Sequence, residues 1–169
     1  NLSRFAETLI PAIHENQKTA IKKAEEVVGS FSDIYKNAWL EMMRSKLGLL
    51  GKEAEDEKII NSFLLWMQKI RADYTNSFYF LTNNNVLNTN LSQDNSFINW
   101  HKQWRDRLSK NKKPLKDSFS LMKKNNPAII PRNHRVEEAL KDAGDGNLLT
   151  TFNLIDFLKK PYESSLKNS

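Results

Sequence analysis

The residues best suited to chemistry gather in one short stretch, "NPAIIPRNHRVEEAL", which runs from Asn126 to Leu140. Two prolines bracket three apolar residues, and a basic segment with a histidine follows at once. Proline fixes its own φ angle and pushes the preceding residue toward an extended backbone. We therefore expect a rigid strap followed by a helix. The candidate interaction or structural motif comprises Asn126, Pro127, Pro131, Arg132, Asn133, His134 and Arg135.

The helix that follows the strap is expected to begin near Asn133, whose side chain is of a type that caps helices. Loss of such a cap costs about 1 kcal/mol, so the same cost is expected for Asn133→Ala. Arg132 and Arg135 then stand at a helix start, where anions are favoured. Either they meet carboxylates, within this chain or on another part of the protein, or they are solvated. The inward face of this helix is expected to comprise Val136, Ala139, Leu140 and Ala143.

Other patterns typical of active sites do not occur in the sequence. The chain has no cysteine, which excludes thiolate nucleophiles and cysteine-based zinc sites. Its five glycines form neither a G-x-G-x-x-G nor a G-x-x-x-x-G-K phosphate loop. The histidines His14, His101 and His134 are far apart and lack the spacing of a zinc-protease helix. The residues alone therefore nominate no catalytic, cofactor-binding or metal-binding group.

A second aromatic and basic segment, "FINWHKQWRDR", carries Trp100 and Trp104 four residues apart on one helical face. Exposed tryptophans beside basic residues would favour stacking on single-stranded nucleic acid. We expect both to pack in the core, with the basic residues on a solvated face, and we expect no nucleic-acid partner. The alternative is a stand-alone basic helical module that binds nucleic acid or an acidic protein. The basic residues are Lys102, Arg105, Arg107, Lys110, Lys112, Lys113, Lys116, Lys123 and Lys124.

Apolar residues recur at steps of three and four along most of the chain, and strict alternation is not sustained anywhere. This pattern predicts an all-α fold of about seven helices in one compact orthogonal or irregular bundle, without significant sheet. Asp73 is expected to cap a short aromatic helix, and Gly48 to end a long one. Ser3 is expected to cap a first short helix, which Pro11 kinks or ends with a new turn. Further helices are expected from Thr19 to Leu47, from about Glu53 to Ile70, after Asp73, around Phe97 to Leu108, after Pro114, from about Asn133 to Ala143, and from about Leu148 to Leu158.

The length of 169 residues suits one domain with one core, so residues 1–169 are expected to form a single domain. Residues 82–96 are rich in asparagine and are expected to form a mobile surface loop, and residues 163–169 a flexible tail. No apolar run approaches the roughly 20 residues of a membrane span, and the first residues do not have the order of a signal peptide. We therefore expect a cytoplasmic protein without a membrane partner.

Six phrases, taken in order, resemble the C-terminal part of the selenoprotein O (SelO, YdiU-like) family. They are "NLSRFAETLIP", "WLEMMRSKLGL", "LLWMQKIRADYTNSFYFL", "WHKQWRDRL", "NPAIIPRNHRVEEAL" and "GDGNLLTTFNLIDFLKKPYE". The resemblance extends from Asn1 to about Glu163. Members of this family are pseudokinase-fold proteins that transfer AMP from ATP, with a divalent metal, onto hydroxyl side chains of other proteins.

The resemblance implies that this chain is a C-terminal fragment without its own active site, since the family's nucleotide- and metal-binding residues lie upstream. Accordingly, the chain lacks a strand lysine of the V-A-I-K kind and a D-F-G, and Val136 follows Arg135 where a catalytic loop has aspartate. No cofactor is expected here; ATP and magnesium are expected for the full-length parent. The implied partners are the upstream kinase-like domain and the parent's protein substrates. Two departures are Tyr79, where the family phrase "TFR-x-L" has arginine, and the tail "SSLKNS", which replaces a cysteine or selenocysteine of some members.

Overall fold

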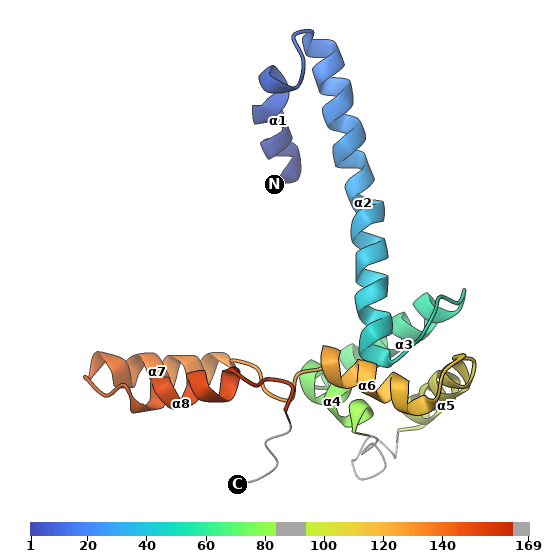
Figure 1. Ribbon diagram of the computed structural model, residues 1–169, viewed down its shortest axis with the longest axis vertical. Helices are drawn as coiled ribbons and strands as arrows, with labels where there is room; N and C mark the ends of the chain where they lie inside the picture. The colour runs from blue at the N-terminus through green and yellow to red at the C-terminus, as the bar shows by residue number, and fades with distance from the viewer. Residues whose placement is uncertain (84–93, 164–169) are drawn as a thin grey trace. The chain divides into compact units, whose positions relative to one another are not determined.

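The computed structural model describes residues 1–83 and 94–163, and within these ranges it contains helices and no strand (Figure 1). The prediction of an all-α fold is therefore confirmed. The helices are α1 (Leu2–Ile13), α2 (Gln17–Leu47), α3 (Asp56–Ile70), α4 (Tyr74–Thr82), α5 (Asn95–Ser109), α6 (Leu115–Asn125), α7 (Asn133–Gly144) and α8 (Leu149–Leu158). In the described part of the chain, no helix is long and apolar enough to cross a membrane.

The chain divides into two compact units, Asn1–Glu41 and Met42–Ser169. A single domain over residues 1–169 stays a prediction. The predicted mobile loop at 82–96 and flexible tail at 163–169 lie mainly outside the described residues. Of the loop, the end of α4 and the start of α5 are described, and Asp94 caps α5 by accepting a hydrogen bond from the backbone N–H of Phe97.

The first unit contains α1 and most of α2, which run antiparallel (Figure 1). Asn16 lies in the turn between them and accepts a hydrogen bond from the backbone N–H of Thr19 at 3.1 Å. Helix α1 begins at Leu2 with Asn1 at the N-cap position, so Ser3 lies inside the helix and its predicted role as the cap is wrong. Pro11 lies inside α1, and the helix continues to Ile13. No residue of α1 is buried, although α1 has a clearly apolar face.

The second unit is built around an aromatic core between α3 and α5. The ring of Phe63 stacks on Trp100 with centroids 4.1 Å apart, and Trp100 stacks on Trp104 at 5.9 Å. The indole N–H of Trp100 donates to the carbonyl of Ile59 at 2.9 Å, and that of Trp104 donates to the carbonyl of Leu47 at 2.8 Å. The two tryptophans are only 4% and 0% exposed, so the expected core packing is confirmed.

The end of α2 depends on Gly48, which has a φ angle of +69°. A Cβ at this position would lie 2.9 Å from the carbonyl oxygen of Ser118 in α6. Glycine is thus required both for the left-handed backbone and for the close approach of α6. The expected helix end at Gly48 is confirmed.

A buried ion cluster, formed by Arg44, Asp56 and Arg107, ties α2, α3 and α5 together. The Asp56 carboxylate accepts from Nε of Arg44 at 2.6 Å and from Nε of Arg107 at 2.6 Å, through different oxygens. The backbone N–H of Glu53 also donates to it, at 3.0 Å. Arg107 was expected on a solvated basic face and is instead buried. It lies three residues after Trp104 and seven after Trp100, so it shares their inward face.

Asn111 extends this network to α6. Its side-chain oxygen accepts from Arg107 at 2.8 Å and from the backbone N–H of Leu50 at 3.1 Å. Its amide nitrogen donates to the carbonyl of Gly48 at 3.1 Å and to the hydroxyl of Ser118 at 2.7 Å. Among the described residues, no buried side-chain nitrogen or oxygen is left without a hydrogen-bond partner.

Helices α7 and α8 lie side by side as a hairpin (Figure 1). The turn between them contains Gly146 with a φ angle of +87°. The hydroxyl of Thr150 donates to Asp142, and that of Thr151 donates to the carbonyl of Ala139 at 3.2 Å. Ala139 is buried as expected, but Leu140 is 67% exposed, so its predicted inward position is wrong. A hairpin of two helices covers only one narrow side of each, and Leu140 lies outside that side.

We expect Asp56→Ala to lower the free energy of unfolding by about 3–5 kcal/mol, because two arginines are left buried without their carboxylate. Chemical denaturation followed by circular dichroism measures this change. Asp106→Ala serves as the matched control, since Asp106 is exposed on α5 and its loss should cost no more than about 0.5 kcal/mol. A loss below about 1 kcal/mol for Asp56→Ala would contradict a stabilising role of the cluster.

The same cluster predicts how stability depends on pH. Burial by itself would raise the pKa of Asp56, but the hydrogen bonds from Arg107, from the backbone of Glu53 and from Arg44 outweigh burial and lower the pKa. Since the unfolded carboxyl has a pKa of about 3.9, the contribution is complete above that pH and is lost as the pH falls through the lower folded pKa. The contribution of Asp56 to the free energy of unfolding should change little between about pH 7 and 5 and fall below about pH 4.

In Asp56→Asn this fall should be shallower, and denaturation curves at stepped pH measure it. It should not vanish, because hydrogen bonds also lower the pKa values of Glu55 and Asp73, chiefly those from Lys110 and Arg132 respectively. An equal pH dependence of the variant and the unmodified chain would show that Asp56 has no part in it.

Candidate functional site

Asn126, the first residue of the predicted motif, is buried where α2, α4 and α6 meet. Its backbone N–H donates to the carbonyl of Met122 at 2.8 Å and closes α6. Its side-chain nitrogen donates to the carbonyl of Lys46 at 2.8 Å and to the hydroxyl of Thr82 at 2.9 Å. Its side-chain oxygen accepts from Nζ of Lys46 at 3.1 Å. Asn126 thus holds three helices together through one amide group.

Lys46 is the partner that the sequence analysis missed. Its Nζ also donates to the carbonyl of Asn125 at 3.0 Å and lies over the rings of Phe78 and Tyr74, at 5.0 and 5.6 Å from their centroids. Burial lowers the pKa of Lys46. A signal was present, because Lys46 follows the buried Met43 by three residues and therefore lies near its helical face.

The strap, residues 127–131, is held by the chain that follows α8. The backbone N–H groups of Ala128 and Ile129 both donate to the carbonyl of Pro161, at 2.7 and 3.2 Å. Asn126 has the extended conformation that the following proline predicts, with φ −120° and ψ 99°. Ile129 and Ile130 are half-buried. The strap therefore joins the two ends of the α7–α8 hairpin where they leave the rest of the second unit.

The start of α7 differs from the prediction. Asn133 is the first helical residue, Arg132 occupies the N-cap position, and no side chain caps the helix. The backbone carbonyl of Arg132 accepts from the N–H groups of Arg135 and Val136, at 2.9 and 3.1 Å. Arg132 keeps an extended backbone, with ψ 136°, and closes the first turn. Asn133 therefore lies one position too late to act as a cap, and the predicted cost of Asn133→Ala is withdrawn.

Arg132 meets a carboxylate of the same chain. Its guanidinium donates to Oδ2 of Asp73 at 2.6 Å, while Oδ1 of Asp73 accepts from the backbone N–H of Asn76 at 2.8 Å. The hydrogen bond from Arg132, followed by that from Asn76, lowers the pKa of Asp73. One carboxylate therefore caps α4, as predicted, and also binds the start of α7.

The remaining motif residues are exposed on the first turns of α7. Arg135 pairs with Glu138 at 3.0 Å within the same helix. The His134 side chain makes no hydrogen bond or ion pair with the described residues. Both ends of the Arg135 pair are exposed, so the pair contributes little to stability. Of the seven motif residues, Asn126 and Arg132 make the side-chain contacts to the rest of the second unit, and the seven do not converge on one cavity.

Two hollows border the motif, and neither has the features of a nucleotide site. The first has a volume of about 120 Å³, well below the roughly 300–1,000 Å³ of small-molecule pockets. It is lined by Tyr79, Thr82, Asn83, Lys123, Asn126 and Tyr162. The second, of about 430 Å³, lies between the strap and the hairpin and is mostly apolar. In residues 1–83 and 94–163, no group of three or more His, Cys, Asp or Glu side chains is placed to hold a metal ion.

A family model and several individual proteins match nearly the whole of this chain. A family model described as "Protein adenylyltransferase SelO" matches residues 1–159. A "Protein nucleotidyltransferase YdiU" of Clostridium botulinum (strain Hall) is 48% identical over 166 residues, which is 98% of this chain and 34% of the relative. Proteins of the same name from Brevibacillus brevis and Clostridium perfringens are 47% and 44% identical, over 96% and 98% of this chain and 33% and 34% of theirs. The chain thus spans about a third of the length of these relatives.

We expect Asn126→Ala to lower the free energy of unfolding by about 1–3 kcal/mol, because the buried Lys46 carbonyl and Thr82 hydroxyl lose their donor. Arg132→Ala removes a half-exposed ion pair and should cost about 0–1 kcal/mol, and Arg135→Ala still less. Thermal and chemical denaturation of the three variants gives this order. Asn133→Ala is the control and should resemble Arg135→Ala, since Asn133 makes no cap. If Arg132→Ala were the most damaging of the four, the strap would depend on the ion pair and not on Asn126.

Proposed function

This chain belongs to the SelO family of protein adenylyltransferases, and we propose that it forms the C-terminal helical domain of such an enzyme. The whole protein transfers AMP from ATP onto hydroxyl side chains of other proteins. This domain supplies no catalytic residue and docks against the kinase-like part. The observation that carries the proposal is the family match over residues 1–159 in a chain that spans only about a third of its relatives.

The way in which two carboxylates are bound supports a non-catalytic role. Asp56 is saturated by two arginines and a backbone N–H, and Asp73 is shared between a helix cap and Arg132. A catalytic acid, base or metal ligand needs a free position toward the substrate or the metal. In the part of the chain that the structure describes, these two carboxylates hold helices in place.

Exposed apolar side chains support a docking role. Large apolar residues are exposed on α1, α2, α7 and α8. Single exposed apolar residues are normal on a soluble protein, but several on the same helix indicate a contact surface. The exposed residues include Leu2, Phe5, Leu9, Val27, Phe31, Ile34, Leu140, Leu149, Phe152, Ile155 and Phe157. Inter-domain contacts of the usual size, about 600–1,500 Å², would cover surfaces of this kind.

The described residues do not fit a site for ATP and magnesium, because they offer neither a phosphate-binding loop nor a set of metal-binding carboxylates. In our proposal both belong to the kinase-like part of the whole protein. We also propose that the whole protein acts on other proteins and that it is located in the cytoplasm. The alternative of a nucleic-acid-binding module required exposed tryptophans, and the burial of Trp100 and Trp104 removes that support.

A chimera tests the proposed function. In it, this chain replaces the matching 166 residues of the Clostridium botulinum relative. We expect the chimera to label protein substrate with AMP from radioactive ATP, whereas the relative without these residues should have lost most of that activity. The isolated chain should show no saturable binding of ATP with magnesium in calorimetry. Saturable binding by the isolated chain, or a folded chimera that transfers no AMP, would contradict the proposal.

A further inference from the structure

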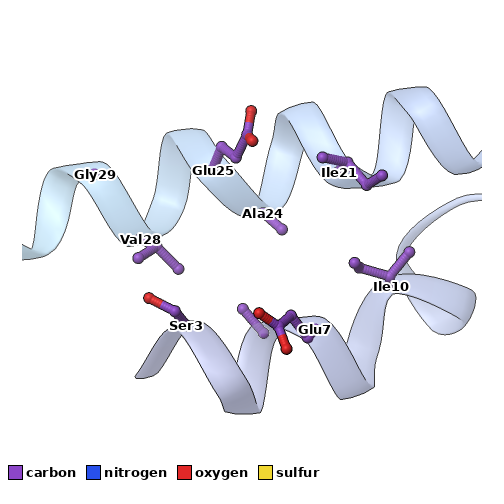
Figure 2. A pocket seen from close by; sticks show the side chains of 9 residues that line it. Ser3, Glu7, Ile10, Ile21, Ala24, Glu25, Val28 and Gly29 are labelled. Atoms are coloured by element: carbon purple, nitrogen blue, oxygen red, sulfur yellow. The ribbon is translucent and has the colours of Figure 1, made fainter. Parts of the chain in front are cut away.

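The helix pair of the first unit presents apolar side chains to a gap that neither helix fills. Ala24 and Val28 of α2 point toward α1, and Ser3 and Ile10 of α1 point toward α2, with open space between them (Figure 2). Two packed helices normally lie 8–10 Å apart with interdigitated side chains. Here α1 buries none of its residues fully and only Ala6, Ile10 and Ile13 are half-buried, so the pair leaves most of the apolar face of α1 exposed.

The gap has two hollows of about 560 Å³ each, which we name together the α1–α2 groove. The hollows share Ala6, Ala24 and Val28 and otherwise use different faces of the two helices. Ala6 and Ala24 are small, which permits close approach of another backbone, and Val28 adds apolar surface. The second hollow takes its α1 side from Leu2, Phe5, Leu9 and Ile13, and Phe5 is 62% exposed.

Apolar side chains continue along α2 beyond the groove. Ser3, near the start of α1, lines the same hollow as Val28 and Gly29, so α1 does not cover later positions of α2. Phe31, Ile34 and Tyr35 are 46%, 62% and 60% exposed there, and Phe31 and Tyr35 lie four and eight residues after Val27 of the second hollow. From Ile21 to Tyr35 this stripe is about 21 Å long at the usual helical rise. Its length suits a polypeptide of several helical turns better than a small ligand.

Charge at the borders of the groove narrows the choice of occupant. Glu7 and Glu25 border one hollow, and Glu26 and Lys23 border the other, so acidic residues outnumber basic ones three to one. Within the described residues Glu25 and Glu26 make no ion pair, unlike Glu7, which binds Arg4 at 2.9 Å. A two-fold dimer would bring the same acidic borders from both copies into one interface. A different segment that carries basic residues beside an apolar face is therefore favoured over a second copy of this chain.

We propose that the α1–α2 groove seats an apolar helix with basic side chains, which belongs to the part of the family chain outside the match. This inference rests on the proposed function. About two thirds of each relative's length lies outside the match, so such a segment has a source in the same polypeptide. Covalent linkage gives it an effective concentration on the order of millimolar, so a modest contact area suffices.

Thiol labelling in the chimera tests this inference, since the chain itself has no cysteine. Ala24→Cys lies in the groove, and Ser30→Cys lies on α2 outside both hollows as the matched control. We expect maleimide to modify Ala24→Cys at least about tenfold more slowly in the chimera than in the isolated chain. Ser30→Cys should react at the same rate in both. Mass spectrometry of the labelled peptides separates these sites from cysteines of the relative.

A photocrosslink identifies the occupant directly. Phe5, replaced by benzoylphenylalanine in the chimera, should crosslink to a helix-forming peptide from the relative's remaining two thirds. A crosslink to a second copy of the chimera, or only within this chain, would overturn the proposal. Equal labelling of Ala24→Cys in chimera and isolated chain would overturn it as well. If the chimera still transfers AMP in those cases, the groove inference alone has failed; a folded chimera without AMP transfer contradicts the proposed function itself.

Discussion

The arrangement of the second unit depends on the neutralisation of one buried carboxylate. Asp56 begins α3, and its two oxygens bind arginines from the end of α2 and the end of α5. A charge without water around it is tolerated only when paired and fully hydrogen-bonded, so these helix ends have little freedom to move apart. The aromatic stack of Phe63, Trp100 and Trp104 then fills the space between helices whose separation the ion cluster has set. Asn111 carries the same constraint on to Gly48 and α6.

Much of the fold could be predicted from the sequence because its signals are local. The three- and four-residue steps of apolar residues identified the helices, and Gly48 and Asp73 act at the positions where their chemistry predicts an end and a cap. The ion cluster was missed for a physical reason. Asp56 and Arg107 are 51 residues apart, and helical periodicity says nothing about which faces meet. The position of Arg107 on the same face as two tryptophans was a usable signal, since a charged residue among buried ones needs a partner.

The candidate site was located correctly as a segment but was misjudged in detail. Pro127 and Pro131 enclose a strap as expected, yet the residue that ties it to the core is Asn126, through Lys46 and Thr82, which are 80 and 44 residues away in sequence. Asn133 is a residue type that caps helices, but Arg132, which follows Pro131 with an extended backbone, occupies the N-cap position instead. The helix therefore starts one residue earlier than a cap at Asn133 would allow. A cap is decided by the backbone before it, so residue type alone does not fix its position.

The double role of Asp73 restricts which amino acids evolution can place there. Serine and asparagine would cap α4 about as well as aspartate, and threonine somewhat less well, but all three would leave Arg132 without its counter-charge. Glutamate would keep the charge, but it is not among the side chains that favour the N-cap position. The two tasks, each satisfied by several residue types, have only aspartate in common. Arg132 is less restricted, because lysine carries the same charge. Substitutions at this ion pair are therefore expected at position 132 before position 73.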